Sequence, residues 1–582
     1  MKIRTMALTS AVLVSSAAIL AGCGSSTQPS AAQPKTGGTA VVALAPQTSP
    51  NWFFPTLSAA AYSDVNTQVD SMMYRPLIMF NKEDQVDYAR SLVSSITYNS
   101  TGTRYVLTLS PKYKWSNGQP ITAQDVVFTW DVMQAASGSN APWTYGGAGI
   151  GGVPSLWKSV TADGSNKVIV TITTPSNPDW FIHNGLGQIW PVPASVWDKY
   201  PTNMTQELKF INSVANTPTN PVYDVVDGAY HFKSWAANNN WTFVPNKNFG
   251  GHPSSLSKVV FQYETNDSSE FLALKAGTVN EGYLPASSWG SRAELTNDTM
   301  SAPYELGFNY LIINFNPQAP NGLGPVFSHL YVRKALQMGV DQAGIIQTLF
   351  HGLGVEEGGP VASKPVTPYS DPATAKPLYP FNPAAGKKLL EDHGWHEVNG
   401  VMEQNGVKLE FTFLAVSGDQ TQTDIQQLLK QDWAQEGIVV NIEQQPFDNI
   451  IAEANQQGKD ASSWNMADWG GGWTYQPDYY PTGGGLFKTG SASNFQGYAN
   501  NTMNQLIDKS YLPGTPAQTQ QALYNYELYA AQQLPVIWLP WPVGSYAGTG
   551  SPAEHANNLH GTVKTFNPIT DMIFPNYWTI SQ

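Results

Sequence analysis

Cysteine, charge and long apolar runs are all scarce in this sequence. Cys23 is the only cysteine among 582 residues, which excludes an internal disulfide and a thiolate metal site. Lys, Arg, Asp and Glu make up 13% of the chain, against about 25% in an average soluble protein. The formal net charge is −13, so nucleic acid is not an expected partner. Beyond the first 22 residues, no stretch is long and apolar enough to cross a membrane.

The first residues have the pattern of an export signal. Lys2 and Arg4 precede a mostly apolar stretch at 6–20, which is too short to span a bilayer comfortably. It ends in the letters LAGC at residues 20–23, a lipoprotein cleavage box. We therefore expect residues 1–22 to be a signal peptide and the thiol of Cys23 to be acylated, although an ordinary buried cysteine is the alternative. Residues 23–36 are rich in Ser, Gln, Pro and Gly and predict a flexible tether.

The remaining chain is too long for one core and mixes strands with helices throughout. Apolar alternation predicts strands at residues 39–45, 103–110, 167–174, 228–235, 258–264, 309–316, 408–416 and 438–445. Apolar periodicity of about 3.6 predicts helices at residues 123–136, 268–276, 331–340, 383–393, 421–435 and 517–533. The strand–helix–strand order at 408–445 predicts a βαβ unit with a parallel pair.

Residues 112–133 combine several local signals. Asn117-Gly118 is a tight-turn dipeptide. Thr122 and Asp125 resemble a capping box that opens the helix at 123–136. We therefore expect a strand, a turn and a capped helix, in which Trp115 and Trp130 pack in the core.

Motifs for covalent or nucleotide chemistry are weak. The run at Gly147–Gly152 has the letters of a dinucleotide fingerprint but lacks the flanking strand and helix. The AAGKK run at Gly386 lacks the upstream glycine of a P-loop. His393 and His396 could share a metal, but no third ligand follows at a suitable spacing, and a solvated helix end is the simpler interpretation. No Ser/His/Asp arrangement or dedicated carboxylate pair is evident.

The segment NGQPITAQDVVFTW at 117–130 resembles the signature region of the family 5 extracellular solute-binding proteins, receptors of ABC importers for peptides, nickel or oligosaccharides. VVDGAYHFKSW at 225–235 is similar to a family strand, with Asp227 and Ala229 as departures. Residues 309–354 resemble a further family block, with an insertion near Asn321. FNPAAGKKLLEDHGW at 381–395 and WNMADWGGGWTYQPDYY at 464–480 also look like family segments in the family's order.

The resemblance implies an α/β, two-lobed fold like that of periplasmic binding proteins, with an extra inserted domain and a ligand cleft between the lobes. We expect lobe one at 37–77, 216–305 and 541–582, the inserted domain at 78–215, and lobe two at 306–540.

The resemblance also suggests ligand-binding residues. In many peptide-binding relatives, an aspartate shortly after the glycine-tryptophan segment pairs with the ligand's amino terminus, and no acid stands at that place here. Asp468 and Asp478 flank the gap, and either could serve if the register shifts, although Asp478 could instead cap a turn. Trp469, Trp473 and Tyr475 could stack on sugar rings or belong to the core. Asn51 and Trp52 are further candidates to line the cleft.

Three functions follow as hypotheses. The first is a lipid-anchored, extracytoplasmic receptor that captures oligopeptides and delivers them to an ABC permease for import. The second is the same role for an oligosaccharide or another small solute, favoured by the missing aspartate and by the aromatic residues of the glycine-rich loop. The third is a surface-anchored hydrolase, for which no catalytic constellation is found. We expect no enzyme activity, no cofactor, no metal site and a monomer, located in the periplasmic space if the cell has an outer membrane.

Overall fold

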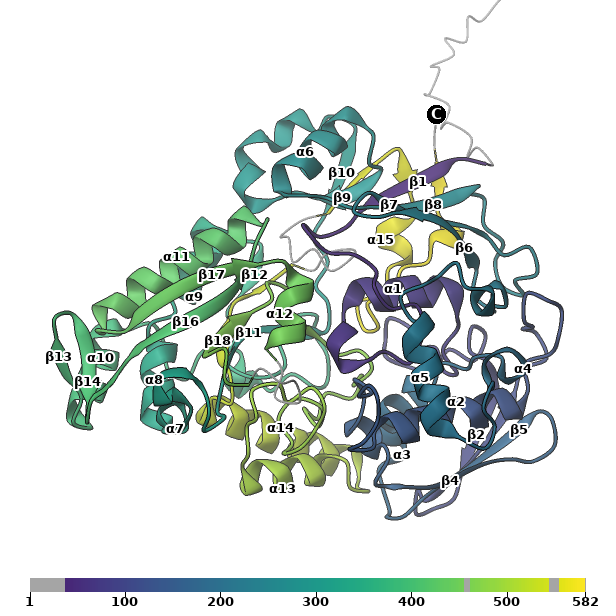
Figure 1. Cartoon of the computed structure of the whole chain (residues 1–582), viewed down its shortest axis with the longest axis horizontal. Coiled ribbons are helices and arrows are strands. Elements are labelled where there is room, and N and C mark those ends of the chain that lie inside the picture. Colours follow the sequence, from purple (N-terminus) through teal and green to yellow (C-terminus); the bar gives the residue numbers. More distant parts are fainter. Residues whose placement is uncertain (1–36, 455–460, 544–553, 581–582) are drawn as a thin grey trace, which may run out of the picture.

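The computed structural model describes residues 37–454, 461–543 and 554–580, and its elements are labelled in Figure 1. The predicted signal peptide, the tether and Cys23 lie outside the described residues. Within the described ranges, no helix is both long and apolar enough to span a bilayer.

A seven-stranded mixed sheet lies at the top of Figure 1, in the order β10-β22-β9-β1-β8-β7-β6. Its strands are β1 (Thr39–Ala43), β6 (Tyr230–Ala236), β7 (Asn240–Pro245), β8 (Lys258–Gln262), β9 (Glu281–Tyr283), β10 (Asp298–Ser301) and β22 (Glu554–Asn557). β1 pairs in parallel with β8 and β9, whereas the outer pairs are antiparallel. The helices α1 (Asp64–Met73) and α6 (Asp267–Ala276) accompany this sheet.

A four-stranded antiparallel sheet, in the order β2-β3-β5-β4, lies at the lower right of Figure 1. Its strands are β2 (Val93–Tyr98), β3 (Arg104–Leu109), β4 (Trp157–Ala162) and β5 (Lys167–Ile172), and it is accompanied by α2 (Ala123–Ala136), α3 (Pro178–Trp180), α4 (Ala194–Trp197) and α5 (Met204–Val214). Trp130 of α2 stacks on Trp157 of β4 with ring centroids 4.3 Å apart. The predicted cap is present, because the backbone N–H of Thr122 donates to the carboxylate of Asp125 at 2.8 Å. We call the two sheets and their helices the first body.

The second body is built on a six-stranded sheet in the order β17-β16-β18-β11-β19, with β20 also paired to β11. Its strands are β11 (Gly307–Ile313), β16 (Glu410–Val416), β17 (Val439–Gln445), β18 (Met466–Asp468), β19 (Trp473–Thr474) and β20 (Ile537–Leu539). Its helices are α7 (Leu323–Phe327), α8 (Leu330–Met338), α9 (Gln342–Thr348), α10 (Pro383–Asp392), α11 (Gln420–Gln435), α12 (Phe447–Glu453), α13 (Asn501–Ser510) and α14 (Pro516–Gln533). The parallel pairing of β16 and β17 around α11 confirms the predicted βαβ unit.

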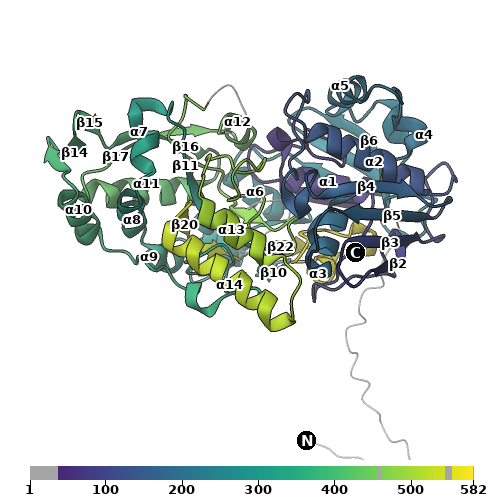
Figure 2. The ribbon, with the colours of Figure 1, turned by 90° about the horizontal axis from the view of Figure 1, so that it is seen from below.

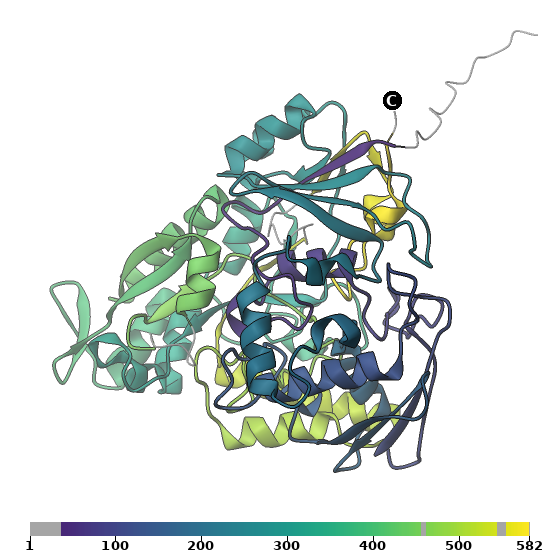
Figure 3. The ribbon, with the colours of Figure 1, turned by 45° about the vertical axis from the view of Figure 1, so that its right-hand side comes forward.

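Short elements complete the fold. They are β12 (Gly354–Val355) paired with β21 (Trp541–Pro542), the small sheet of β13 (His396–Val398), β14 (Val401–Gln404) and β15 (Val407–Lys408), and the pair β23 (Leu559–His560) and β24 (Thr579–Ile580) beside α15 (Thr562–Thr565). The two bodies stand side by side when the molecule is seen from below (Figure 2), whereas in the turned view of Figure 3 the first body overlaps part of the second.

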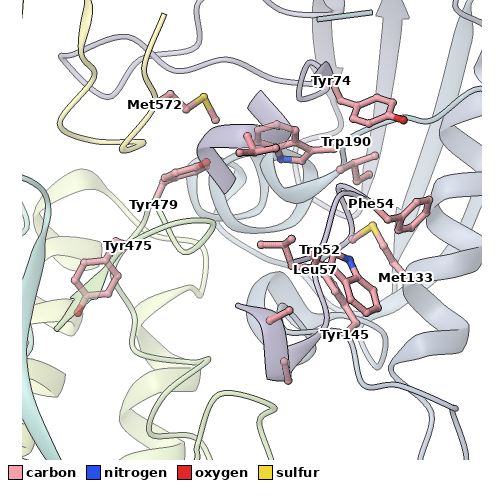
Figure 4. Close-up of a cluster of buried hydrophobic side chains, with 14 of the residues drawn as sticks. Trp52, Phe54, Leu57, Tyr74, Met133, Tyr145, Trp190, Tyr475, Tyr479 and Met572 are labelled. Atoms are coloured by element: carbon pink, nitrogen blue, oxygen red, sulfur yellow. The ribbon is translucent and has the colours of Figure 1, made fainter. Parts of the chain in front are cut away.

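The largest hydrophobic cluster crosses from one body to the other. It includes Trp52 and Tyr145 of the first body together with Phe308 and Tyr475 of the second. Figure 4 shows part of this cluster, with Tyr475 on the side of the second body and Trp52 on the side of the first. A separate cluster fills the far side of the second body, under α8 and α11. The two bodies are therefore packed against each other in this conformation.

Candidate functional site

A hollow of about 70 Å³ lies where the two bodies meet, and we call it the interbody cavity. The first body contributes Thr48 and the chain around the start of α1. The second body contributes α12, the chain around β19 and a later loop. The described residues that line the cavity are Thr48, Tyr62, Ser63, Asp64, Val65, Phe447, Ile451, Trp469, Gly471, Gly472, Trp473, Thr474 and Phe495.

The start of α1 positions the first wall. Ser63 is the N-cap of α1, and its hydroxyl accepts a hydrogen bond from the backbone N–H of Asn66 at 3.3 Å. Asp64 is the first helical residue, so its carboxylate benefits from the positive end of the helix dipole. A small polar N-cap residue followed by an acid commonly begins a helix. Here this helix start places Tyr62 and Asp64 at the junction of the two bodies.

Strand β19 positions the second wall. It pairs antiparallel with β11, and Trp473 stands opposite Phe308 in the register. Gly472 precedes the strand with a φ of 74°. A Cβ atom at Gly472 would lie 2.3 Å from the carbonyl oxygen of Phe308, so this close approach requires glycine. The bend carries Trp473 and Thr474 toward the first body.

Tyr62 and Asp64 contact β19 directly. The hydroxyl of Thr474 donates to Oδ1 of Asp64 at 3.0 Å. The ring of Tyr62 stacks on Trp473, with centroids 5.6 Å apart and an interplanar angle of 18°. The Tyr62 hydroxyl also donates to the carbonyl oxygen of Gln476. Burial raises the pKa of Asp64, and the hydrogen bond from Thr474 opposes that rise.

The cavity combines one acid with flat aromatic walls. Among the described residues that line it, Asp64 is the only one with a formal charge. The indole Nε1 of Trp473 is buried and has no hydrogen-bond partner among the described residues. A ligand here could place a cation or a donor at Asp64, an acceptor at Trp473 and an apolar or sugar face against the rings.

Two of the seven predicted ligand-binding residues line the interbody cavity. Trp469 and Trp473 are both there. Tyr475 is fully buried in the largest hydrophobic cluster (Figure 4). Its hydroxyl donates to the carbonyl oxygen of Pro360.

The two predicted acids lie outside the wall of the interbody cavity. Oδ1 of Asp468 accepts a hydrogen bond from the backbone N–H of Gly470 at 2.8 Å, and burial raises the pKa of Asp468 to about 7. Oδ1 of Asp478 accepts a hydrogen bond from the side-chain amide of Asn184, and burial raises the pKa of Asp478 to about 8. Asp478 thus joins the second body to the first.

Asn51 and Trp52 are also absent from the described lining. The side chains of Asn51 and Asn66 face each other, with Nδ2 of Asn66 donating to Oδ1 of Asn51 at 2.8 Å. The indole N–H of Trp52 donates to the carbonyl oxygen of Thr56 at 3.2 Å, and its ring meets the edge of Trp143 at 5.2 Å. Both residues therefore stabilise the loop that leads to α1.

Tyr62, Asp64 and Thr474 were not among the residues predicted from the sequence. The only local signal was the Ser63-Asp64 pair, which reads as a helix start and not as a binding site. Thr474 lies 410 residues from Asp64 in the sequence, so no spacing rule connects the two.

Comparisons with known proteins identify the family. Residues 87–492 match the family described as bacterial extracellular solute-binding proteins, family 5 Middle, over more than half of the chain. The oligopeptide-binding protein AppA of Bacillus subtilis (strain 168) is 24% identical over 493 residues, which cover 82% of each chain. A dipeptide-binding protein of Lactococcus lactis subsp. cremoris (strain MG1363) is 24% identical over 430 residues, covering 70% of this chain and 72% of the relative. The nickel-binding periplasmic protein of Escherichia coli (strain K12) is 23% identical over 481 residues, covering 81% and 83%.

The solved structure of AppA from Bacillus subtilis in complex with a nonapeptide has the same fold. Its TM-score is 0.79 at 20% sequence identity, and the match covers 94% of this chain and 100% of that chain. This confirms the predicted two-lobed α/β fold of a periplasmic binding protein. The chain belongs to the bacterial extracellular solute-binding proteins, family 5.

Proposed function

We propose that this chain captures peptides between its two bodies, outside the cytoplasmic membrane, and delivers them to the permease of an ABC importer. The relatives named for oligopeptides and dipeptides support this ligand class. The single observation that carries the proposal is the position of Asp64, an acid that faces an aromatic cavity at the junction of the bodies. Binding is noncovalent, and the protein does not act as an enzyme.

In this proposal, the carboxylate of Asp64 accepts a hydrogen bond from the N-terminal ammonium group of the peptide. A charged hydrogen bond of this kind contributes about 1.5–3 kcal/mol. Thr474 already donates to one oxygen of Asp64, so the carboxylate is held in place from the opposite body. An ammonium group would add a second donor to the same carboxylate and would bind both bodies through it.

The cavity must widen to admit a peptide. Its volume of about 70 Å³ is below the roughly 300–1,000 Å³ of ordinary ligand pockets. The contacts that close it are individually modest, at about 1 kcal/mol for a typical hydrogen bond. Two such hydrogen bonds join the bodies. The hydroxyl of Ser417 donates to Oε1 of Gln47 at 2.7 Å, and the hydroxyl of Ser49 donates to Oδ2 of Asp448 at 3.3 Å. Opening of the two bodies, followed by closure on the ligand, accounts for both the small cavity and the hydrogen bonds between the bodies.

The domain division predicted from the sequence is part of this proposal. We place lobe one at 37–77, 216–305 and 541–582, the inserted domain at 78–215, and lobe two at 306–540. The three large sheets support it, because each draws its strands from one of these sets of residues. A monomer held to the membrane by lipid on Cys23 completes the proposed arrangement.

A sugar is the second candidate ligand. Trp469, Trp473 and Tyr62 present several aromatic rings in one small cavity, and aromatic rings stack well on sugar faces. Under this alternative Asp64 accepts hydroxyl donors and no ammonium group.

Titration of intrinsic tryptophan fluorescence distinguishes the two candidates. A pool of short free peptides is expected to change the emission, whereas cello- and xylo-oligosaccharides are not. Asp64→Asn is expected to weaken peptide binding by about 10- to 100-fold, since it removes a charged hydrogen bond. The reverse ligand preference, or an unchanged peptide affinity in Asp64→Asn, contradicts the proposal.

Two further variants serve as comparisons. Asp163→Asn changes an exposed acid in the turn between β4 and β5 and is expected to leave the affinity unchanged. Asp478→Asn tests the acid that the sequence suggested. A loss of peptide affinity in Asp478→Asn but not in Asp64→Asn would assign the ammonium group to Asp478.

A further inference from the structure

Two adjoining hollows lie in the first body, away from the interbody cavity. Their volumes are about 50 and 330 Å³, and they share Arg90 and Tyr577. They lie between the end of α1, the chain that precedes β2, and the C-terminal segment at 564–577. None of the described residues that line them belongs to the lining of the interbody cavity. We call them together the cationic pocket.

The charge of this pocket is opposite to that of the chain. Its described lining includes five basic residues and neither Asp nor Glu. The whole sequence has 43 acidic and 30 basic residues. The basic residues are Arg75, Lys82, Arg90, Lys112 and Lys564.

Arg75 lacks a full set of partners. Its Nη2 donates to the carbonyl oxygen of Arg90, and its guanidinium lies 4.3 Å from the centroid of the Tyr113 ring. Its Nε is buried and has no hydrogen-bond partner among the described residues. The carboxyl of Asp227 accepts from the backbone N–H of Arg75 at 3.1 Å; burial raises the pKa of Asp227 to about 8, and the charge of Arg75 opposes that rise. Arg75 therefore keeps one buried donor, Nε, without a partner among the described residues.

The other cations keep donors available. Arg90 is paired with Asp87 through Nε alone, at 2.6 Å, and its guanidinium lies 5.1 Å from the centroid of the Phe574 ring. Nζ of Lys82 donates to the backbone carbonyl oxygen of Lys564 at 2.9 Å. Burial lowers the pKa of Lys82. The charge of Arg90 lowers this pKa further, whereas the charge of Glu83 raises it. Lys564 itself is exposed.

We propose that the cationic pocket binds a phosphate group. A phosphate has several acceptor oxygens and about two negative charges, which match the clustered ammonium and guanidinium donors. The larger hollow has room for phosphate with a small organic group attached. The group is either a free phosphate or the headgroup of an anionic lipid.

A lipid source is compatible with the position of the pocket. The backbone N–H of Gly37, the first described residue, donates to Ser255 O at 2.7 Å, and Ser255 Oγ donates to Trp578 O at 2.7 Å. Trp578 directly follows Tyr577 of the pocket. The described part of the chain therefore begins on the side of the protein that carries the pocket.

Calorimetric titration of the purified chain with inorganic phosphate tests the proposal. Saturable binding is expected in the parent protein. The double variant Lys82→Gln/Lys564→Gln is expected to bind phosphate about tenfold more weakly, because it removes two nearby charges. The double variant Lys209→Gln/Lys430→Gln, at exposed lysines of α5 and α11, is expected to match the parent. Absence of saturable binding, or equal binding by the two double variants, overturns the proposal.

Lys564→Gln alone provides a variant at an exposed position, should the double variant fail to fold, and it too is expected to weaken phosphate binding. Co-sedimentation with phosphatidylglycerol or phosphatidylcholine vesicles then separates the two sources. Binding to the anionic vesicles that inorganic phosphate displaces identifies the headgroup; phosphate binding without vesicle binding identifies the free ion. Peptide affinity is expected to be equal in all these variants, so a failure here is distinct from a failure of the peptide proposal.

Discussion

Gly471 and Gly472 are adjacent in the sequence, but a side chain added at each would have different surroundings. Gly472 has a φ of 74°, and a Cβ there would lie 2.3 Å from the carbonyl oxygen of Phe308. At Gly471 a Cβ would meet no atom within 4 Å. Gly472→Ala is expected to lower the free energy of unfolding by roughly 2–4 kcal/mol, from backbone strain and overpacking together. Urea denaturation measures this change.

Gly471→Ala is the matched control. It is expected to change the free energy of unfolding by less than about 0.5 kcal/mol. Gly471 lines the interbody cavity, so the added methyl group is expected to lower peptide affinity although stability is kept. Equal stability of the two variants would contradict the assigned backbone geometry.

At the same scale, the sequence predicted two of the residues that line the interbody cavity. Trp469 and Trp473 were recognisable because a glycine-rich aromatic loop is unusual and resembles a family segment. Asp64 was not recognisable, because its proposed role depends on the contact with Thr474 and on the fold that brings the two together. Buried acids such as Asp468 looked equally plausible in the sequence, since one sequence does not show which acids are satisfied by the backbone.

At the scale of elements, local signals predicted most of the large helices and strands. The helix at 123–136 was predicted with the bounds that α2 has, because the capping residues fix its start. The predicted pair at 408–445 is also present as β16, α11 and β17. Strand β22 of the seven-stranded sheet was not predicted. It pairs with β9 and β10, which lie more than 250 residues earlier in the sequence, and its four residues have no distinctive pattern.

The N-terminus of α6 in the first body contacts the N-terminus of α11 in the second. The buried acids at this contact predict that the stability of the fold depends on pH. Oδ2 of Asp267 accepts from the backbone N–H of Gln420 at 2.8 Å, and Asp419 is the N-cap of α11. Burial, with the charge of Asp419, raises the pKa of Asp267 to about 8, and burial raises that of Asp419 to about 6. Other acids near this pair are Glu264, Glu270, Asp424 and Asp468.

A raised pKa in the folded state means that the protonated acid is favoured there. The resulting stabilisation is present below the ordinary pKa of Asp, near 4, and is lost as the pH rises through about 6 and 8. Asp267→Asn keeps an acceptor for Gln420 but removes the charge. We expect its melting temperature to exceed that of the parent at pH 8 and to approach it at pH 5. A difference that does not change with pH, or one that Asp163→Asn reproduces, would argue against this origin.

At the scale of the whole molecule, the arrangement of the sheets followed only from the resemblance to a family. Periodicity predicts strands but not that β1, β8 and β22 share one sheet, since their pairing depends on contacts between distant segments. The same holds for the hydrophobic cluster that joins the bodies. In this conformation aromatic side chains from both bodies are buried in one cluster, so the proposed opening would expose part of this surface.

Small-angle X-ray scattering of the purified chain, recorded with and without a saturating pool of short free peptides, tests the central claim most directly. If peptides bind between the two bodies and hold them together, the radius of gyration falls on addition of the pool, and it stays unchanged with the same peptides acetylated at their amino ends. A radius that does not respond to free peptides, while fluorescence reports that they are bound, would contradict capture by closure.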